Sequence, residues 1–157
     1  MPTEVQNSYN TDATFVSVSW QRGQRLTISN RQVSSVSFYL KRIGAPPTGG
    51  GYITIYTLAD VVMASVTVSN AEIQALPTSY ALFTKSITPT VINEEVRMVF
   101  GVNTFGTPEL CVAMAYQNTD VKASESRTSS NPWTEDGTSD CAYQYTYIDY
   151  TPTIFYF

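Results

Sequence analysis

Apolar and polar residues alternate with a period of two along most of the chain. In residues 35–41, the apolar side chains of Val36, Phe38 and Leu40 fall on one face, and serine, tyrosine and lysine fall on the other. This period is typical of a β-strand that has one buried face and one solvated face. Similar runs recur between groups of glycine, proline, asparagine and serine residues, so the pattern predicts an all-β chain.

The same pattern predicts the individual strands. Residues 22–24 and 29–31 are predicted turns, and the glycine- and proline-rich residues 44–51 are a predicted loop. Strands are expected at residues 15–20, 25–28, 33–43, 52–58, 63–68, 80–86, 95–103, 110–116, 141–148 and 153–157.

Two further segments differ from this pattern. One short helix is expected at residues 70–77, with Asn70 as its N-cap and Pro77 as its end. Residues 117–139 form a long polar connection, and function often lies in such segments.

Strands without intervening helices favour antiparallel pairing, and this many strands in one chain fit two packed sheets. We expect a single domain over residues 13–157, an all-β, two-sheet antiparallel β-sandwich of jelly-roll type. Residues 1–12 are expected to form a flexible N-terminal arm or an edge segment. The expected core consists of Phe15, Val36, Phe38, Leu40, Ile53, Ile55, Phe83, Val96, Met98, Phe100, Val102, Cys141 and Tyr143.

The absence of histidine narrows the chemistry that the chain can carry. It excludes Ser-His-Asp and Cys-His catalysis and histidine-ligated zinc. A glycosidase needs two carboxylates across a cleft, and the acidic groups Glu94-Glu95, Glu135-Asp136 and Asp140 form no such motif. We expect no enzyme activity and no cofactor. A structural calcium ion would suit the fold, but no loop follows a calcium-binding pattern.

The charge and hydropathy of the chain limit the classes of partner that it is expected to bind. The net charge is −4, and the nine Lys and Arg residues are scattered, whereas duplex nucleic acid needs a clustered basic patch. We therefore expect no nucleic-acid partner. No stretch reaches the roughly 20 apolar residues of a membrane span. The N-terminal residues lack the features of a secretory signal peptide. The chain is thus expected to be a domain of a longer exported protein or a small whole protein, and a virion protein fits the second case.

Cys111 and Cys141 are the two cysteines of the chain. Both fall in predicted antiparallel strands, so a disulfide could join them in an oxidising compartment. The alternative is two buried free thiols, because a free cysteine behaves as a small hydrophobic residue.

Several segments of the chain together carry a resemblance to a known family. They are residues 33–44, Pro47-Thr48-Gly49, residues 53–56, residues 115–120, residues 131–134 and the strand after Asp140. Together they resemble jelly-roll domains attached to secreted microbial and phage proteins, similar in outline to carbohydrate-binding modules. The resemblance implies a non-catalytic binding, adhesive or structural module, and it implies no particular ligand.

The candidate ligand contacts are aromatic residues with polar neighbours. A sugar stacks its C–H face on an exposed aromatic ring, while its hydroxyls need polar groups nearby. Tyr39, Tyr52 and Tyr56 fall on the outer faces of expected neighbouring strands, although outward tyrosines also reflect strand propensity alone. The aromatic residues of the polar stretch could bind sugar or fix their loops on the core. The predicted ligand-binding set is Trp133, Tyr116, Asn118, Asp120, Tyr52 and Tyr56.

Two functional hypotheses remain open. The first is a glycan-binding or adhesive module at an extracellular or virion surface, whose partner is a polysaccharide or cell-surface glycan. The second is a structural subunit of a virion, as capsid or spike, or of a surface filament. In that case the chain would form a homo-oligomer through its chain ends, including the aromatic run Ile154-Phe155-Tyr156-Phe157. The resemblance and the polar stretch favour the first hypothesis, and the sparse charge and this run favour the second.

Overall fold

The computed structural model describes residues 1–15, 20–44, 49–103, 112–118, 124–128 and 132–152. These residues form eleven strands and one short helix, and every strand pair among them is antiparallel. The predicted all-β class is confirmed, and the jelly-roll connectivity stays a prediction.

The elements are β1 (Thr3–Gln6), β2 (Thr11–Thr14), β3 (Trp20–Arg42), β4 (Gly51–Thr57), β5 (Val62–Val68), α1 (Asn70–Gln74), β6 (Ala81–Val102), β7 (Val112–Gln117), β8 (Ser124–Thr128), β9 (Thr134–Asp136), β10 (Asp140–Cys141) and β11 (Tyr143–Asp149).

Two long strands, β3 and β6, form a ribbon that runs through the whole molecule. Their pairing extends from Gln21 opposite Gly101 to Leu40 opposite Ala81. At one end β4 continues the sheet beside β6, followed by β5; at the other end β11 continues it beside β3, followed by β1. The resulting order is β1-β11-β3-β6-β4-β5 in one continuous sheet.

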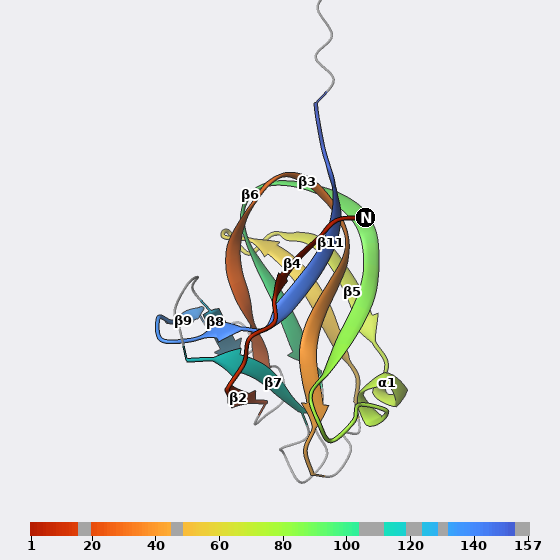
Figure 1. The fold of residues 1–157 in the computed structure, drawn as a ribbon, viewed down its shortest axis with the longest axis vertical. Helices are drawn as coiled ribbons and strands as arrows, with labels where there is room; N and C mark the ends of the chain where they lie inside the picture. The colour runs from red at the N-terminus through yellow and green to blue at the C-terminus, as the bar shows by residue number, and fades with distance from the viewer. Residues whose placement is uncertain (16–19, 45–48, 104–111, 119–123, 129–131, 153–157) are drawn as a thin grey trace, which may run out of the picture.

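The ribbon bends over itself and closes as an arch (Figure 1). The pairing register shifts between Ile28 and Arg31, and Asn30 has a φ of 49°. Asparagine tolerates this left-handed conformation better than most residues. The N–H of Asn30 donates to Oδ1 of Asn93 on β6 at 3.1 Å, so a side chain replaces a backbone partner that the bend removes.

Two predicted turns are therefore wrong. Residues 29–31 form a bend inside β3, so the strands expected at 25–28 and 33–43 are a single strand. Residues 22–24 are also part of β3. A Cβ at Gly23 would lie 1.8 Å from the carbonyl oxygen of Met98, so this glycine marks a close approach of two backbones and not a turn.

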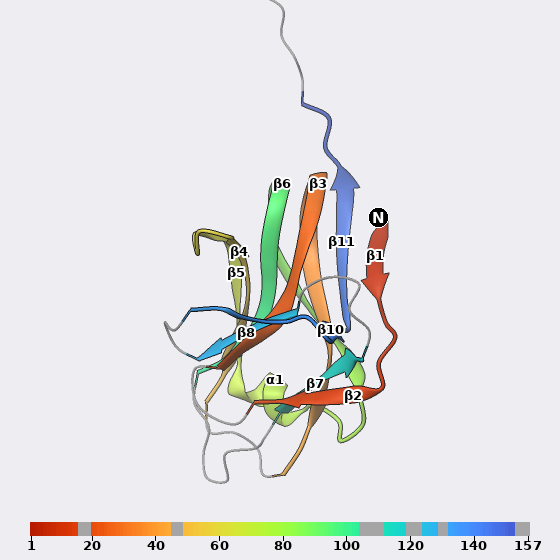
Figure 2. The ribbon, with the colours of Figure 1, turned by 90° about the vertical axis from the view of Figure 1, so that its left-hand side faces the viewer.

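The arch turns the sheet into two facing layers (Figures 1 and 2). The first layer holds residues 20–28 of β3 and 94–102 of β6, with β4, β5 and β8. The second layer holds the other halves of β3 and β6, with β11 and β1. Phe83 of the second layer meets Phe100 of the first, with ring centroids 6.4 Å apart. The core therefore lies between the two halves of one ribbon.

The predicted core is confirmed for every member except Phe83, which is half-buried and packs against the core. Strand alternation explains this agreement, because it alone decides which side chains face the space between the layers. Tyr145 is also fully buried and belongs to the same cluster.

Residues 3–6 form β1 at the edge of the described sheet, which agrees with the edge segment that the sequence allowed as the alternative to a flexible arm. β1 pairs with β11, where Glu4 lies opposite Tyr145. The Glu4 carboxylate accepts hydrogen bonds from the Tyr145 hydroxyl at 2.9 Å and from Arg31. Burial and this carboxylate raise the pKa of Tyr145, so its phenol stays a donor. These contacts fix the strand on the sheet.

Helix α1 is shorter than predicted and has a different cap. The Ser69 hydroxyl accepts a hydrogen bond from the Glu72 N–H at 3.2 Å, and the Glu72 carboxylate accepts one from the Ser69 N–H at 2.8 Å. This capping box replaces the expected Asn70 cap. Lys85 on β6 forms an ion pair with Glu72 at 2.8 Å, and with Ser69 it lowers the pKa of Glu72 to about 2.

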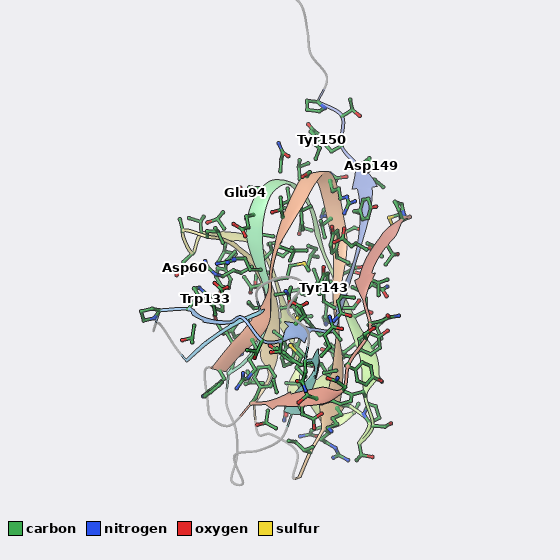
Figure 3. All side chains as sticks on the ribbon, turned by 60° about the vertical axis from the view of Figure 1, so that its left-hand side comes forward. Asp60, Glu94, Trp133, Tyr143, Asp149 and Tyr150 are labelled. Carbon is green, nitrogen blue, oxygen red and sulfur yellow. The ribbon has the colours of Figure 1, made fainter. Side chains whose placement is uncertain are left out.

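Part of the polar stretch at residues 117–139 is a hairpin and not a simple connection. β8 pairs with residues 20–24 of β3, and β9 pairs with β8. The hairpin extends the first layer and carries the chain toward Trp133 (Figure 3).

Gly23→Ala should lower the free energy of unfolding by about 3 kcal/mol or more, because the added Cβ forces β3 away from Met98. Thr27→Ala is the matched control, since Thr27 is exposed in the same strand, and its effect should stay below about 1 kcal/mol. Chemical denaturation measures both. Equal and small losses would contradict the close pairing of β3 and β6 at Gly23.

Candidate functional site

The outer face of the first layer carries two of the predicted tyrosines. Ile53 and Ile55 of β4 point into the core, so alternation places Tyr52 and Tyr56 on the opposite face. Tyr56 lies opposite Arg97 of β6, and Tyr52 lies opposite Gly101. The pairing of β4 with β6 therefore sets both tyrosines beside the residues of β6.

Trp133 lies on this face, next to Tyr56 and Asp60 (Figure 3). Its indole Nε1–H donates to Oδ1 of Asp60 at 2.6 Å. The Tyr56 ring meets the indole edge-on, with centroids 6.1 Å apart and an interplanar angle of 62°. The guanidinium of Arg97 lies 5.2 Å from the indole centroid. We call these four residues, Trp133, Tyr56, Asp60 and Arg97, the Trp133 site.

Arg97 connects the Trp133 site to strand β6. It is 9% exposed, although it carries a charge. Its Nη1 donates to the carbonyl oxygen of Leu58 at 2.9 Å and lies 3.7 Å from Oδ1 of Asp60. Asp60 has a φ of 62°, and its side chain is 46% exposed. Arg97 thus ties the turn between β4 and β5 to β6 and balances the charge of Asp60.

Tyr52 extends the polar row away from the Trp133 site. A Cβ at Gly101 would lie 2.3 Å from the Tyr52 ring, so the ring rests where Gly101 has no side chain. The Nε2 of Gln21 donates to the Tyr52 hydroxyl at 2.5 Å and lies 3.5 Å from the Tyr56 hydroxyl. Gln21 on β3 therefore links both tyrosines.

This arrangement suits an uncharged polar ligand with an apolar face. An aromatic ring offers a surface for C–H groups, and a half-exposed carboxylate accepts hydrogen bonds from hydroxyls. The contacts of the indole fix its orientation before any ligand binds, which lowers the entropic cost of binding. Among the described residues, no group of three or more histidine, cysteine, aspartate or glutamate side chains could hold a metal ion.

The structure brings together only part of the predicted ligand-binding set. Trp133 and Tyr56 are in contact, and Tyr52 joins Tyr56 through Gln21. Tyr116 is 4% exposed and packs in the core, away from the other members of the set. Asn118 is exposed, and its backbone N–H donates a hydrogen bond to Oδ1 of Asn10. Asp120 lies outside the described residues.

Asp60, Arg97 and Gln21 were not predicted as site residues. Arg97 stands between Val96 and Met98, so alternation already places it on the outer face. The sequence did not reveal that β4 pairs with β6, and this pairing is what sets Arg97 opposite Tyr56.

Tyr39 does not join Tyr52 and Tyr56 in a platform, because it lies in the other half of β3. It packs instead against Tyr9, with ring centroids 5.6 Å apart, and Tyr9 also meets Tyr80 at 5.2 Å. Asp12 accepts hydrogen bonds from Lys41 at 2.7 Å and from Tyr80 at 2.5 Å, and these bonds lower its pKa. This second aromatic cluster fastens the segment before β2 to the second layer.

Two of the predicted acidic groups share one partner, and Asp140 has a partner of its own. Arg25 forms ion pairs with Glu95 at 3.3 Å and Glu135 at 3.1 Å. Asp140 is buried, and its Oδ1 accepts a hydrogen bond from Nε2 of Gln24 at 2.9 Å. Gln24 in turn accepts the N–H of Cys141, so this group joins β3 to β10 inside the core.

Cys141 is buried, and burial together with Asp140 raises the pKa of its thiol well above the ordinary value. Cys111 lies outside the described residues. The disulfide between the two stays a prediction.

A shallow apolar hollow of about 250 Å³ lies between α1 and the start of β6, lined by residues that include Leu76, Leu82 and Phe83. None of the predicted ligand contacts lines it.

Within the described residues, no helix is long and apolar enough to cross a membrane. No protein-family model matches the chain, and no curated protein matches it.

Asp60→Asn should cost less than about 1 kcal/mol, because asparagine still accepts the Trp133 N–H and tolerates a positive φ, so that only the 3.7 Å ion pair with Arg97 is lost. Asp60→Ala should cost about 1–2 kcal/mol more, since it removes the acceptor and strains the backbone. Chemical denaturation and the NMR signal of the indole N–H measure these effects. Equal stability of the two variants, with an unshifted indole signal in both, would contradict the contact.

Proposed function

We propose that the protein is a non-catalytic glycan-binding or adhesive module and that the Trp133 site contacts the sugar. The observation that carries this proposal is the partly exposed indole of Trp133, held by Asp60, Tyr56 and Arg97. An aromatic ring fixed beside exposed polar groups is the arrangement that a sugar ring requires.

The charges of the site favour an uncharged glycan. Arg97 and Asp60 lie 3.7 Å apart and offset each other, so the site has no excess charge to attract an ionic ligand. The net charge of −4 also disfavours polyanionic polysaccharides. A neutral polysaccharide or cell-surface glycan is the proposed partner, at an extracellular or virion surface.

A second candidate function is that of a structural subunit of a virion or surface filament. It is favoured by a different observation, the uncharged edge of β5 with the exposed side chains of Val61 and Val62. The two functions are compatible, because the edge of β5 and the Trp133 site use different groups.

The test is affinity electrophoresis through gels that contain a panel of soluble neutral polysaccharides. Trp133→Ala and Tyr56→Ala should each weaken retention by the binding polysaccharide at least tenfold, about 1.4 kcal/mol, because each removes a stacking surface. Tyr150→Ala is the matched control, since Tyr150 is 42% exposed and lies at the far end of the molecule (Figure 3). It should be retained like the original chain.

The stability of Trp133→Ala separates a binding role from a core role. The residue is only partly buried, so its loss should cost about 1–2 kcal/mol, below the roughly 3–5 kcal/mol of a fully buried tryptophan. Equal retention of Trp133→Ala and Tyr150→Ala would overturn the proposed site. A chain that no polysaccharide retains would overturn the proposed function.

A further inference from the structure

The outer face of the first layer carries a third aromatic ring in line with the Trp133 site. The ring of Tyr56 meets the indole of Trp133. Nε2 of Gln21 lies 3.5 Å from the Tyr56 hydroxyl and donates to the Tyr52 hydroxyl at 2.5 Å. Contacts therefore link Trp133 to Tyr56 and, through Gln21, to Tyr52 along one face of the sheet.

The ring of Tyr52 lies flat on the sheet. A Cβ at Gly101 would lie 2.3 Å from Cζ of Tyr52 and 2.6 Å from both Cε2 and the hydroxyl oxygen. Such similar distances to three adjacent atoms place Gly101 beneath the face of the ring and not at its edge. One face of the ring thus covers Gly101, and the other is turned away from the sheet. Because Tyr52 is partly exposed, this second face can stack on the C–H groups of a sugar.

Uncharged hydroxyl groups border the Tyr52 ring. Ser65 and Thr67 of β5 lie opposite Thr54 and Tyr52 of β4, and both are exposed. The Oγ of Ser65 lies 2.7 Å from Oγ1 of Thr54. A hydroxyl can donate and accept hydrogen bonds, as the hydroxyls of a sugar also do. This part of the face therefore matches the neutral glycan that the Trp133 site favours.

The combined surface is longer than one sugar ring. Tyr52 and Tyr56 are four residues apart on β4, which corresponds to about 13 Å along the strand. Asp60, which accepts the N–H of Trp133, lies beyond Tyr56 in the turn that follows β4. A single sugar stacked on the indole would therefore leave the ring of Tyr52 unused.

We infer that the glycan is a linear neutral polysaccharide that runs along β4, with one sugar on Trp133 and a later sugar of the same chain on Tyr52. This inference rests on the proposed function, because it extends the sugar contact of the Trp133 site. Gln21 fixes the Tyr52 ring, and Ser65 and Thr67 bind sugar hydroxyls beside it. The affinity rises with the number of sugars until an oligosaccharide spans both rings, since the second contact is then intramolecular.

The test measures affinity against the length of the glycan. The probe is the neutral polysaccharide that retains the chain in affinity electrophoresis, cut by mild acid into oligosaccharides of one to six sugars. Isothermal titration calorimetry gives the affinity for each length. The original chain should bind the longest oligosaccharide at least about tenfold more tightly than the single sugar.

Two variants make the test specific to Tyr52. Tyr52→Ala removes the ring. Gly101→Ala keeps the ring but places a Cβ where the ring lies, so the ring must leave the sheet. Each should weaken binding of the longest oligosaccharide about tenfold and binding of the single sugar far less, whereas Trp133→Ala should weaken binding at every length. Tyr150→Ala is the control and should bind every length like the original chain, and circular dichroism verifies that each variant is folded.

The outcomes distinguish this inference from the function on which it rests. A chain that no polysaccharide retains would overturn both. Retention that Trp133→Ala weakens, together with an affinity that does not change with oligosaccharide length, would overturn the extended contact alone. Binding of the longest oligosaccharide by Tyr52→Ala and Gly101→Ala with the affinity of the original chain would also overturn it and leave the Trp133 site in place.

Discussion

The pairing of β3 with β6 is the constraint on which the rest of the structure depends. One ribbon supplies the central strands of both layers, and its bend at Asn30 brings those layers face to face. The hydrophobic core is therefore a contact of the ribbon with itself, as the Phe83–Phe100 pair shows. Burial between the halves stabilises the bend, while the hydrogen bond from Asn30 to Asn93 satisfies the backbone there.

The same ribbon positions both surfaces to which we assign a function. Pairing of β6 with β4 sets Arg97 opposite Tyr56, which fixes the place where Trp133 can pack. Pairing of β4 with β5 leaves β5 at the rim, with its outer edge free among the described strands. The proposed sugar site uses side chains on the face of the first layer, and the proposed assembly contact uses backbone groups at its edge.

Alternation was sufficient to predict the class of fold and most of the core, because the period of a strand alone decides which side chains are buried. It did not show that β3 and β6 are continuous, since Gly23 and Asn30 are typical turn residues in sequence. Only the partner strand distinguishes a close approach or a bend from a turn. The same reason explains why only part of the Trp133 site was predicted. Trp133 and Tyr56 are aromatic residues that the sequence alone marks as candidates. Asp60 and Arg97 become candidates only when the strand pairing places them beside Trp133.

Amide hydrogen exchange along β3 tests the central claim most directly. Residues 21–24 are paired on both sides in the first layer, and residues 35–38 are paired on both sides in the second. If one ribbon holds both layers, these amides should open with the same free energy, that of global unfolding. A clearly lower opening free energy for one of the two groups would mean that the layers unfold separately, and it would contradict the account.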